Sequence, residues 1–284
     1  MRGERGLALV AVLWGLAVLS LIAAAMLTAG ATSVRMSRNA WSEAQAQSLA
    51  DAGVYRAIVT LLDTRADHKW RTDSVPRDFT FDGQDVRIAI QSEMGLIDVN
   101  FASKDQLQTL LKLAGAEPQD ADTLAGRIID WRTPAGQQSL NGASNADYKD
   151  AGLGYLPRGG PFQSVDEVNL VLGMTPDLFA RLAPALTVYS HQANFDMNTA
   201  PLAVLLVIPG MDQQKALAMI AARTPPPQPA NTALGADYNR AAIPSGQAFA
   251  IRAVVQSGPF HSARDAIVEL TSDPARPFWI LDWK

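Results

Sequence analysis

The longest run of apolar positions lies at the start of the chain. Between Arg5 and Arg35 no side chain is charged, and nearly every residue from 7 to 31 is Leu, Val, Ala, Ile or Met. As a helix, about 25 residues at 1.5 Å each reach roughly 38 Å, which exceeds the ~30 Å hydrocarbon thickness of a bilayer. Arg2 and Arg5 precede the run, so the positive-inside tendency predicts a cytoplasmic N-terminus and a translocated remainder.

Helical periodicity continues after the apolar run. No Pro occurs before Pro76, and apolar residues recur at steps of three and four on an otherwise polar helix. We therefore predict one continuous helix over about residues 7–65, with half of it in the bilayer and half packed on a globular head. The predicted core-facing stripe comprises Ala52, Tyr55, Val59 and Leu62.

The body of the chain alternates between strand and helix patterns. Asp82-Gly83, flanked by alternating apolar residues, predicts a hairpin over residues 79–91. Residues 102–185 have helical spacing, interrupted by a Gly/Asn/Ser-rich loop at 133–160, and a helix pair is expected around 202–223. The Pro-rich residues 225–245 predict an extended loop. Further strands are expected at 96–99, 186–189, 248–256, 263–270 and 277–283, the last of which carries Phe278, Trp279, Ile280 and Leu281 as a cap on the core.

These elements predict a mixed α+β chain, and a membrane helix that runs directly into a domain-packing helix resembles the shape of pilins and pseudopilins. A long N-terminal transmembrane and stalk helix would pack on an antiparallel sheet, and a helical domain would be inserted between strands. The expected division is a leader at 1–6, a transmembrane helix at 7–34, stalk and first strands at 35–100, the inserted helical domain at 101–185 and the remainder of the head at 186–284.

Two short sequences occur twice. Asp98-Val99-Asn100-Phe101-Ala102 matches Asp196-Met197-Asn198-Thr199-Ala200, and Gly160-Pro161-Phe162-Gln163-Ser164 matches Gly258-Pro259-Phe260-His261-Ser262. Each copy of the first pair precedes a predicted helix. The repetition is explained either by helix-start chemistry used twice or by a duplication.

Composition excludes several classes of chemistry. There is no cysteine, which removes disulfides, thiolate zinc sites and cysteine nucleophiles. The three histidines are widely spaced, and no phosphate-binding loop or nucleophile elbow occurs. With 24 basic and 28 acidic residues, the net charge of −4 gives no basic footprint for nucleic acid. We therefore expect a protein that is not an enzyme.

A helix-hairpin-helix interpretation is the main alternative. Ile208-Pro209-Gly210-Met211 lies between two predicted helices, as in modules that grip a nucleic-acid backbone through hairpin amides. However, the turn is followed by Asp212, and Lys215 and Arg223 are the only nearby cations. Because backbone binding needs several phosphate contacts, no nucleic-acid partner is expected.

Oxygen-bearing residues in the 133–160 region raise the possibility of calcium. The candidate ligands are Asp130, Asn141, Asn145, Asp147 and Asp150, together with loop carbonyls. The alternative is a solvated polar loop with helix caps, because the region lacks an Asp-x-Asp run and EF-hand spacing.

The N-terminal junction leaves three interpretations open: an uncleaved signal anchor, a signal peptide cut after residues 29–31, and a prepilin leader. In the third, the short polar leader ends at Gly6 and the apolar helix begins at Leu7. This arrangement resembles a type IV prepilin leader, which a prepilin peptidase cuts after the glycine. The apolar run is longer than a usual signal-peptide core, which argues against the second interpretation.

Taken in order, several motifs resemble the general secretion pathway protein K family of large minor pseudopilins. The similarity covers nearly the whole chain. It rests on the Gly6-Leu7 junction, Gly95-Leu96-Ile97-Asp98-Val99-Asn100, Ile129-Asp130-Trp131, Phe162-x-Ser164-Val165-x-Glu167 with Leu172-Gly173-Met174-Thr175-Pro176, the segment 182–188, and Asp196-Met197-Asn198-Thr199-Ala200.

The resemblance implies a place at the tip of a type II secretion pseudopilus. The head would be periplasmic and the helix a single span of the bacterial inner membrane, with an N-methylated start at Leu7. The implied partners are the I and J minor pseudopilins, the major pseudopilin and the prepilin peptidase. Most pseudopilins carry Glu at the fifth position after the cleavage glycine. Here that position is Ala11, an expected departure for a tip subunit that lacks one neighbour.

Two further expectations concern contacts and calcium. The stalk segment 40–48 should face partner pseudopilins, with Trp41 and Ala44 as the contact residues. Family members commonly carry further acidic residues after the Asp-Trp and form a calcium-binding loop. This chain has Arg132-Thr133-Pro134 there, and keeps only Ala146-Asp147-Tyr148 of the later element.

Overall fold

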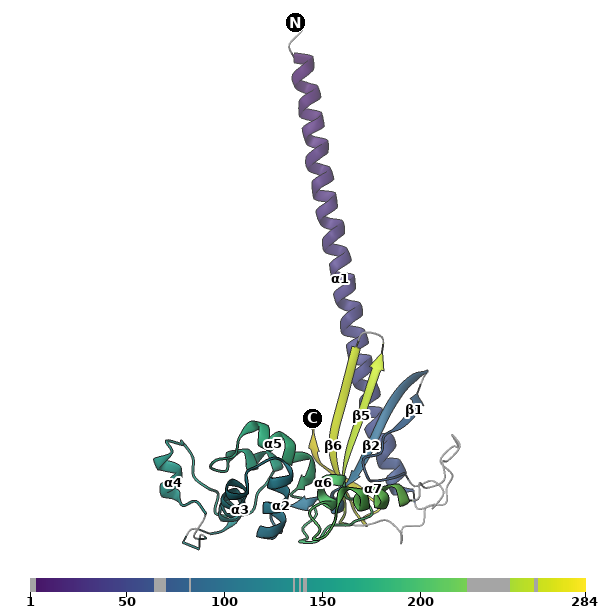
Figure 1. Cartoon of the computed structure of the whole chain (residues 1–284). Coiled ribbons are helices and arrows are strands. Elements are labelled where there is room, and N and C mark those ends of the chain that lie inside the picture. The colour runs from purple at the N-terminus through teal and green to yellow at the C-terminus, as the bar shows by residue number, and fades with distance from the viewer. Residues whose placement is uncertain are drawn as a thin grey trace.

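The computed structural model describes residues 4–63, 70–81, 83–134, 136–137, 139, 142–223, 246–257 and 260–284. Helix α1 (Glu4–Leu62) is 59 residues long and confirms the predicted continuous helix. Figure 1 shows it projecting far beyond the rest of the chain. Residues Leu9–Met26 have a mean hydropathy of 2.5 and none of this window is buried, so the segment can cross a membrane. The expected loop at 225–245 lies outside the described residues.

The buried face of α1 combines alanines with larger aliphatic residues at other positions than predicted, so the predicted stripe is wrong. Tyr55 is 50% exposed, Ala52 and Val59 are only partly buried, and of the four residues only Leu62 belongs to the core. At Gly53 an added Cβ would lie 2.8 Å from Val86 Cγ1, so the sheet approaches too closely for a side chain. The residues that do face the sheet are Ala46, Leu49, Ala50, Val54, Ala57 and Ile58.

The head contains a five-stranded antiparallel sheet whose one face is covered by α1. Strands β1 (Arg77–Phe81) and β2 (Gln84–Ser92) form the predicted hairpin, in which Phe81 pairs with Gln84. The sheet order is β1-β2-β5-β6-β7, so β2 pairs directly with a strand from the end of the chain. The remaining strands are β5 (Ala248–Ser257), β6 (Phe260–Leu270) and β7 (Phe278–Trp283), close to the predicted positions.

Strand β7 does not cap the core as predicted. Trp279, Ile280 and Leu281 are 41–48% exposed. The cause is that β7 is an edge strand with a register shift opposite Ile267 and Val268. Edge strands bury only part of their side chains, and here the partly buried ones against the core are Phe278 and Trp283.

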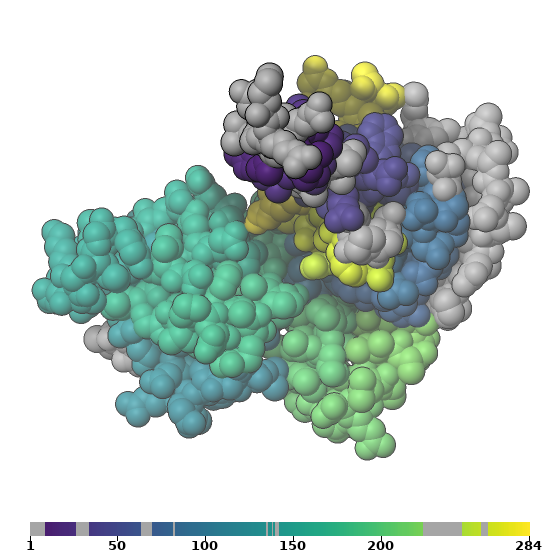
Figure 2. Space-filling model, turned by 90° about the horizontal axis from the view of Figure 1, so that it is seen from above, coloured from purple at the N-terminus to yellow at the C-terminus, as the bar shows by residue number. Residues whose placement is uncertain are grey.

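The chain between β2 and β5 forms a helical module with its own core. Buried residues from Leu96 to Ala216 form one cluster, separate from the cluster of the head. The predicted boundary at residues 185–186 therefore falls inside this core. The space-filling view shows the module, in teal and green, beside α1 and the sheet (Figure 2).

The module consists of short elements. The helices are α2 (Lys104–Leu113), α3 (Pro118–Arg132), α4 (Asn145–Asp150), α5 (Pro176–Leu182), α6 (Leu202–Leu205) and α7 (Gln213–Ala222). Three 3-10 helices occur at η2 (Glu93–Gly95), η3 (Val165–Leu170) and η4 (Ala183–Ala185). The strands expected at 96–99 and 186–189 shorten to β3 (Ile97–Asp98) and β4 (Leu186–Thr187), which pair in parallel. Helix α4 lies inside the region predicted as loop.

The first repeated sequence forms the same turn twice. Asp98 Oδ1 accepts from the backbone N–H of Asn100 at 2.8 Å, and Asp196 Oδ1 accepts from that of Asn198 at 2.9 Å. In both copies the aspartate carbonyl also accepts from the N–H of the terminal alanine, Ala102 or Ala200. A helix follows at once, α2 in one case and α6 in the other. The aspartate, rather than the asparagine, therefore initiates both turns.

An arginine closes each of these two units. Arg132, at the end of α3, donates to the carbonyls of Val99 and Ala102. Arg223, directly after α7, donates to the carbonyls of Met197 and Ala200, the matching positions of the second copy. The correspondence favours duplication of a helical hairpin over a repeated helix start alone. The second repeated sequence shows no such match, because Phe162 precedes η3 whereas Phe260 begins β6.

Candidate functional site

The best-defined polar site in the predicted calcium region is the carboxylate of Asp130. It lies near the end of α3 and is 2% exposed. Its Oδ1 accepts from the N–H of Ser139 at 2.9 Å, and its Oδ2 accepts from the N–H of Ala143 at 3.1 Å. Both oxygens are thus engaged by the backbone of the following loop.

The other candidate ligands serve helix α4. Asp147 Oδ2 accepts from the N–H and Oγ of Ser144, at 2.6 and 2.7 Å, in a capping box. The side-chain hydrogen bond from Ser144 is the largest of the interactions that hold the pKa of the Asp147 carboxyl below its usual range. Asn145 and Asp150 are exposed at the two ends of the helix, and Asn141 lies outside the described residues.

These residues do not assemble into a metal site of the kind expected. Within the described parts of the chain, no group of three or more His, Cys, Asp or Glu side chains is placed to hold a metal ion. Calcium takes six to eight oxygen ligands. Asp130, the one deeply buried carboxylate of the set, already accepts a backbone amide on each oxygen.

An aromatic cluster fixes the remainder of this region. Trp131 stacks on Phe162, with ring centroids 5.9 Å apart and an interplanar angle of 16°. Tyr148 is fully buried, and its hydroxyl accepts from the N–H of Leu172 at 3.0 Å. The N–H of Gly159 donates to the Trp131 carbonyl at 2.9 Å. The loop therefore has a packed interior of its own.

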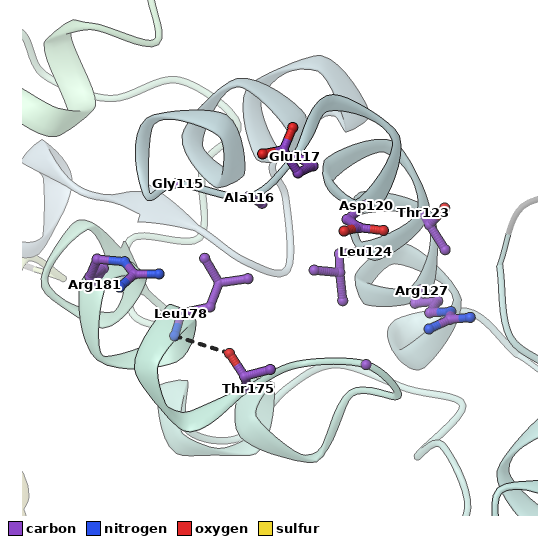
Figure 3. Close-up of a pocket in the computed structure, with 11 residues that line it drawn as sticks. Gly115, Ala116, Glu117, Asp120, Thr123, Leu124, Arg127, Thr175, Leu178 and Arg181 are labelled. Carbon is purple, nitrogen blue, oxygen red and sulfur yellow. Dashed lines mark hydrogen bonds between the residues drawn. The ribbon is translucent and has the colours of Figure 1, made fainter.

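A cavity of about 380 Å³ lies between α3 and α5. Arg127 and Arg181 lie at opposite ends of it, with Glu117 on one rim (Figure 3). Arg127 Nη1 donates to the Leu172 carbonyl at 2.9 Å, and Arg181 Nε donates to the Ala114 carbonyl at 2.5 Å. Each arginine thus binds a backbone carbonyl across the cavity. The two guanidinium groups therefore stabilise the fold around the cavity.

The polar groups in and beside the hairpin between α6 and α7 form hydrogen bonds and ion pairs within the protein. Asp212 caps α7 by accepting from the N–H of Lys215 at 2.8 Å. Lys215 Nζ lies 3.1 Å from both the Gly210 carbonyl and an Asp212 oxygen. Arg223 is ion-paired with the buried Asp73 at 3.3 Å. Both cations that a nucleic-acid backbone would need are therefore engaged, so nothing in this geometry favours nucleic-acid binding.

The predicted contact residues of the stalk lie on the free side of α1. Trp41 is 75% exposed, and Ala44 and Ala11 are also exposed. Trp41 is therefore not part of the core of the head. Gly6 and Leu7 lie in the first turns of α1.

One site was not found from the sequence. Glu93 and Asp98 are 3% and 1% exposed, where the head meets the helical module. Burial raises the pKa of the Glu93 carboxyl to about 7; a hydrogen bond with Thr187 opposes the rise, and the charge of Asp98 adds to it. The signal available in the sequence was an acid beside or within apolar strands, because Glu93 follows β2 and Asp98 lies in the apolar segment 96–99.

Sequence comparisons point to one family. Residues 89–191 match the family model described as type II secretion system protein K. Type II secretion system protein K of Klebsiella pneumoniae is 29% identical over 227 residues, covering 72% of this chain and 69% of that protein. The Pseudomonas aeruginosa protein of the same name is 26% identical over 248 residues, covering 78% and 73%.

A solved structure has the same fold. The chain matches a chain of the GspK-GspI-GspJ complex of the type 2 secretion system from enterotoxigenic Escherichia coli, with a TM-score of 0.60 and 15% identity over 88% of this chain and 98% of that one. An apolar spanning helix that continues into a sheet-packing helix defines a membrane-anchored, pilin-like subunit. The resemblance seen in the sequence is confirmed: residues 89–191 match the protein K family model, and the chain is similar to type II secretion system protein K over more than two thirds of its length.

Proposed function

We propose that this chain forms or caps the tip of the type II secretion pseudopilus, and so supports its assembly and protein export across the outer membrane without catalysing a reaction. The observation that carries this proposal is the position of the helical module beside the sheet (Figures 1 and 2). In a helical fibre every shaft subunit has neighbours on all sides. A broad module beside the head fits best where no further subunit is added.

The anchor supports an inner-membrane location. Arg2 and Arg5 before the apolar span favour a cytoplasmic N-terminus and a periplasmic head. Prepilin peptidase would cut between Gly6 and Leu7, leaving Leu7 to be methylated. Ala11 would then be the fifth residue of the mature helix, where a tip subunit needs no carboxylate.

The partner surface we propose is the exposed side of α1 around Trp41 and Ala44. I-type and J-type minor pseudopilins would pack here helix against helix, and the major pseudopilin would follow below. The solved complex of related subunits joins three proteins named GspK, GspI and GspJ, which supports partners of this kind.

Thiol cross-linking can test this assignment, because the chain contains no cysteine of its own. Trp41→Cys should cross-link to the I-type or J-type subunits in intact cells. Leu113→Cys, on the helical module and 46% exposed, is the matched control and should give no such product. Cross-linking of Trp41→Cys to the major pseudopilin alone would contradict a position at the tip.

A further inference from the structure

The loop after α3 is organised around the buried carboxylate of Asp130. Both oxygens of Asp130 accept backbone N–H groups from that loop, at 2.9 Å from Ser139 and 3.1 Å from Ala143. The carboxylate is 2% exposed, so these donors replace the water that it loses on burial. Backbone amides directed at an anion stabilise it electrostatically as well as by hydrogen bonding.

On one side of this carboxylate the backbone of Gly142 leaves no room for another group. A Cβ added at Gly142 would lie 1.2 Å from Asp130 Oδ2 and 2.3 Å from its Cγ. Only glycine allows this approach. Calcium binds oxygen at 2.3–2.6 Å, so an ion on these oxygens would have to displace the loop. The positive ends of the two amide dipoles also face the position that a cation would take.

The neighbouring side chains are also engaged in contacts within the protein. Arg132 directly follows Asp130-Trp131, and its guanidinium donates hydrogen bonds to the Val99 and Ala102 carbonyls. Asp147 is used in the capping box of α4. The aromatic contacts of Trp131 with Phe162 and Tyr148 hold the two ends of the region together.

We propose that Asp130, held by the amides of Ser139 and Ala143, organises this loop in the absence of calcium, and that calcium binding is not part of its folding. The residues present do not fit the calcium-binding loop that the family resemblance implies. Asp130 is thus a positioning residue of the loop rather than a metal ligand.

Amide hydrogen exchange of the full chain in detergent tests the proposal. In EDTA the amides of Ser139 and Ala143 should be protected, and millimolar calcium chloride should leave their exchange rates unchanged. Asp130→Asn should raise the rate about tenfold or more in both conditions, because an amide side chain offers one acceptor where the loop presents two donors. Asp150→Asn, at the exposed end of α4, is the matched control and should exchange like the wild type.

A second variant keeps the test decisive if Asp130→Asn does not fold. Gly142→Ala leaves every charge in place but removes the close approach, so it should also lose protection at the amides of Ser139 and Ala143 without gaining a calcium response. Protection that appears only when calcium is added to the wild type would overturn the proposal. Unchanged protection in Gly142→Ala would overturn it as well, because the loop would then not rest on the carboxylate.

Discussion

Glu93 is a carboxyl group buried where the sheet leads into the helical module, and its pKa makes stability depend on pH. Its pKa is about 7 in the folded chain, against an ordinary value of 4.5. Between these pH values the folded state keeps the proton whereas the unfolded chain releases it. The stability due to this group is therefore full below about pH 4.5, falls as pH rises to about 7, and stays lost above that.

The size of the effect follows from the two pKa values. Each pKa unit is worth ~1.4 kcal/mol, so the free energy of unfolding should fall by about 3 kcal/mol across this range because of Glu93 alone. Glu93→Gln has no proton to lose and retains a partner for Thr187. The variant should match the wild type near pH 4.5 and exceed it by about 3 kcal/mol at pH 8.

Urea unfolding of the full chain in detergent, followed by tryptophan fluorescence at several pH values, measures this difference. Taking the difference between variant and wild type cancels the other carboxylates. Glu43→Gln, an exposed glutamate on α1, is the control and should show no pH-dependent difference. A Glu93→Gln advantage that is the same at pH 4.5 and pH 8 would refute the reasoning.

Four further outcomes are expected. Mass spectrometry of membrane fractions should find a chain that begins at Leu7, and an uncut terminus in cells with active prepilin peptidase would contradict cleavage after Gly6. Ala11→Glu should reduce secretion or leave it unchanged, since an unpaired acid in the span costs about 2.5–3.5 kcal/mol, whereas improved secretion would argue for a place in the shaft. Trp41→Ala should weaken co-purification with partner pseudopilins by more than about 1 kcal/mol while the melting temperature of the head stays constant; the reverse pattern would remove the proposed interface. Arg223→Met should destabilise the helical module by about 1.5–3 kcal/mol in thermal unfolding, because it leaves two turn carbonyls and part of a buried ion pair without a donor, and an unchanged midpoint would show that the clamp is dispensable.

Elements with a strong local period could be predicted from the sequence. The apolar run predicted the anchor helix, Asp82-Gly83 predicted the hairpin, and turn-separated spacing predicted the three C-terminal strands. The stripe on α1 was assigned to the wrong face because apolar residues recur at helical spacing on both sides of this segment, and the one that packs on the sheet includes Gly53, where the sheet approaches too closely for a side chain. Helix α4 was missed although Ser144-x-x-Asp147 is a capping-box signal.

The candidate site depended on contacts that sequence does not contain. Asp130 could be recognised as a carboxylate in a polar region, but its donors are backbone amides, which every residue type except proline supplies. The arginine clamps on the repeated Asp-x-Asn turns join residues more than 20 positions apart. The sequence showed only that the motif is repeated. The structure showed that an arginine binds equivalent carbonyls in the two copies, those of residues 99 and 102 in the first and 197 and 200 in the second.

The pairing of β2 with β5 has a consequence for the order of folding. Ser92 and Phe249 are partners in the sheet, yet roughly 150 residues of chain separate them, and closing so long a loop is entropically costly unless it is already compact. The helical module can shorten the path by folding first, since Gln91 reaches the Thr199 carbonyl and Met94 receives the N–H of Asp196. As the chain emerges from synthesis, the edge of β2 that pairs with β5, and the part of α1 that packs on β5 and β6, therefore stay uncovered until the last strands arrive. A chain truncated before Ala248 would expose that face permanently and be a substrate for chaperones and proteases.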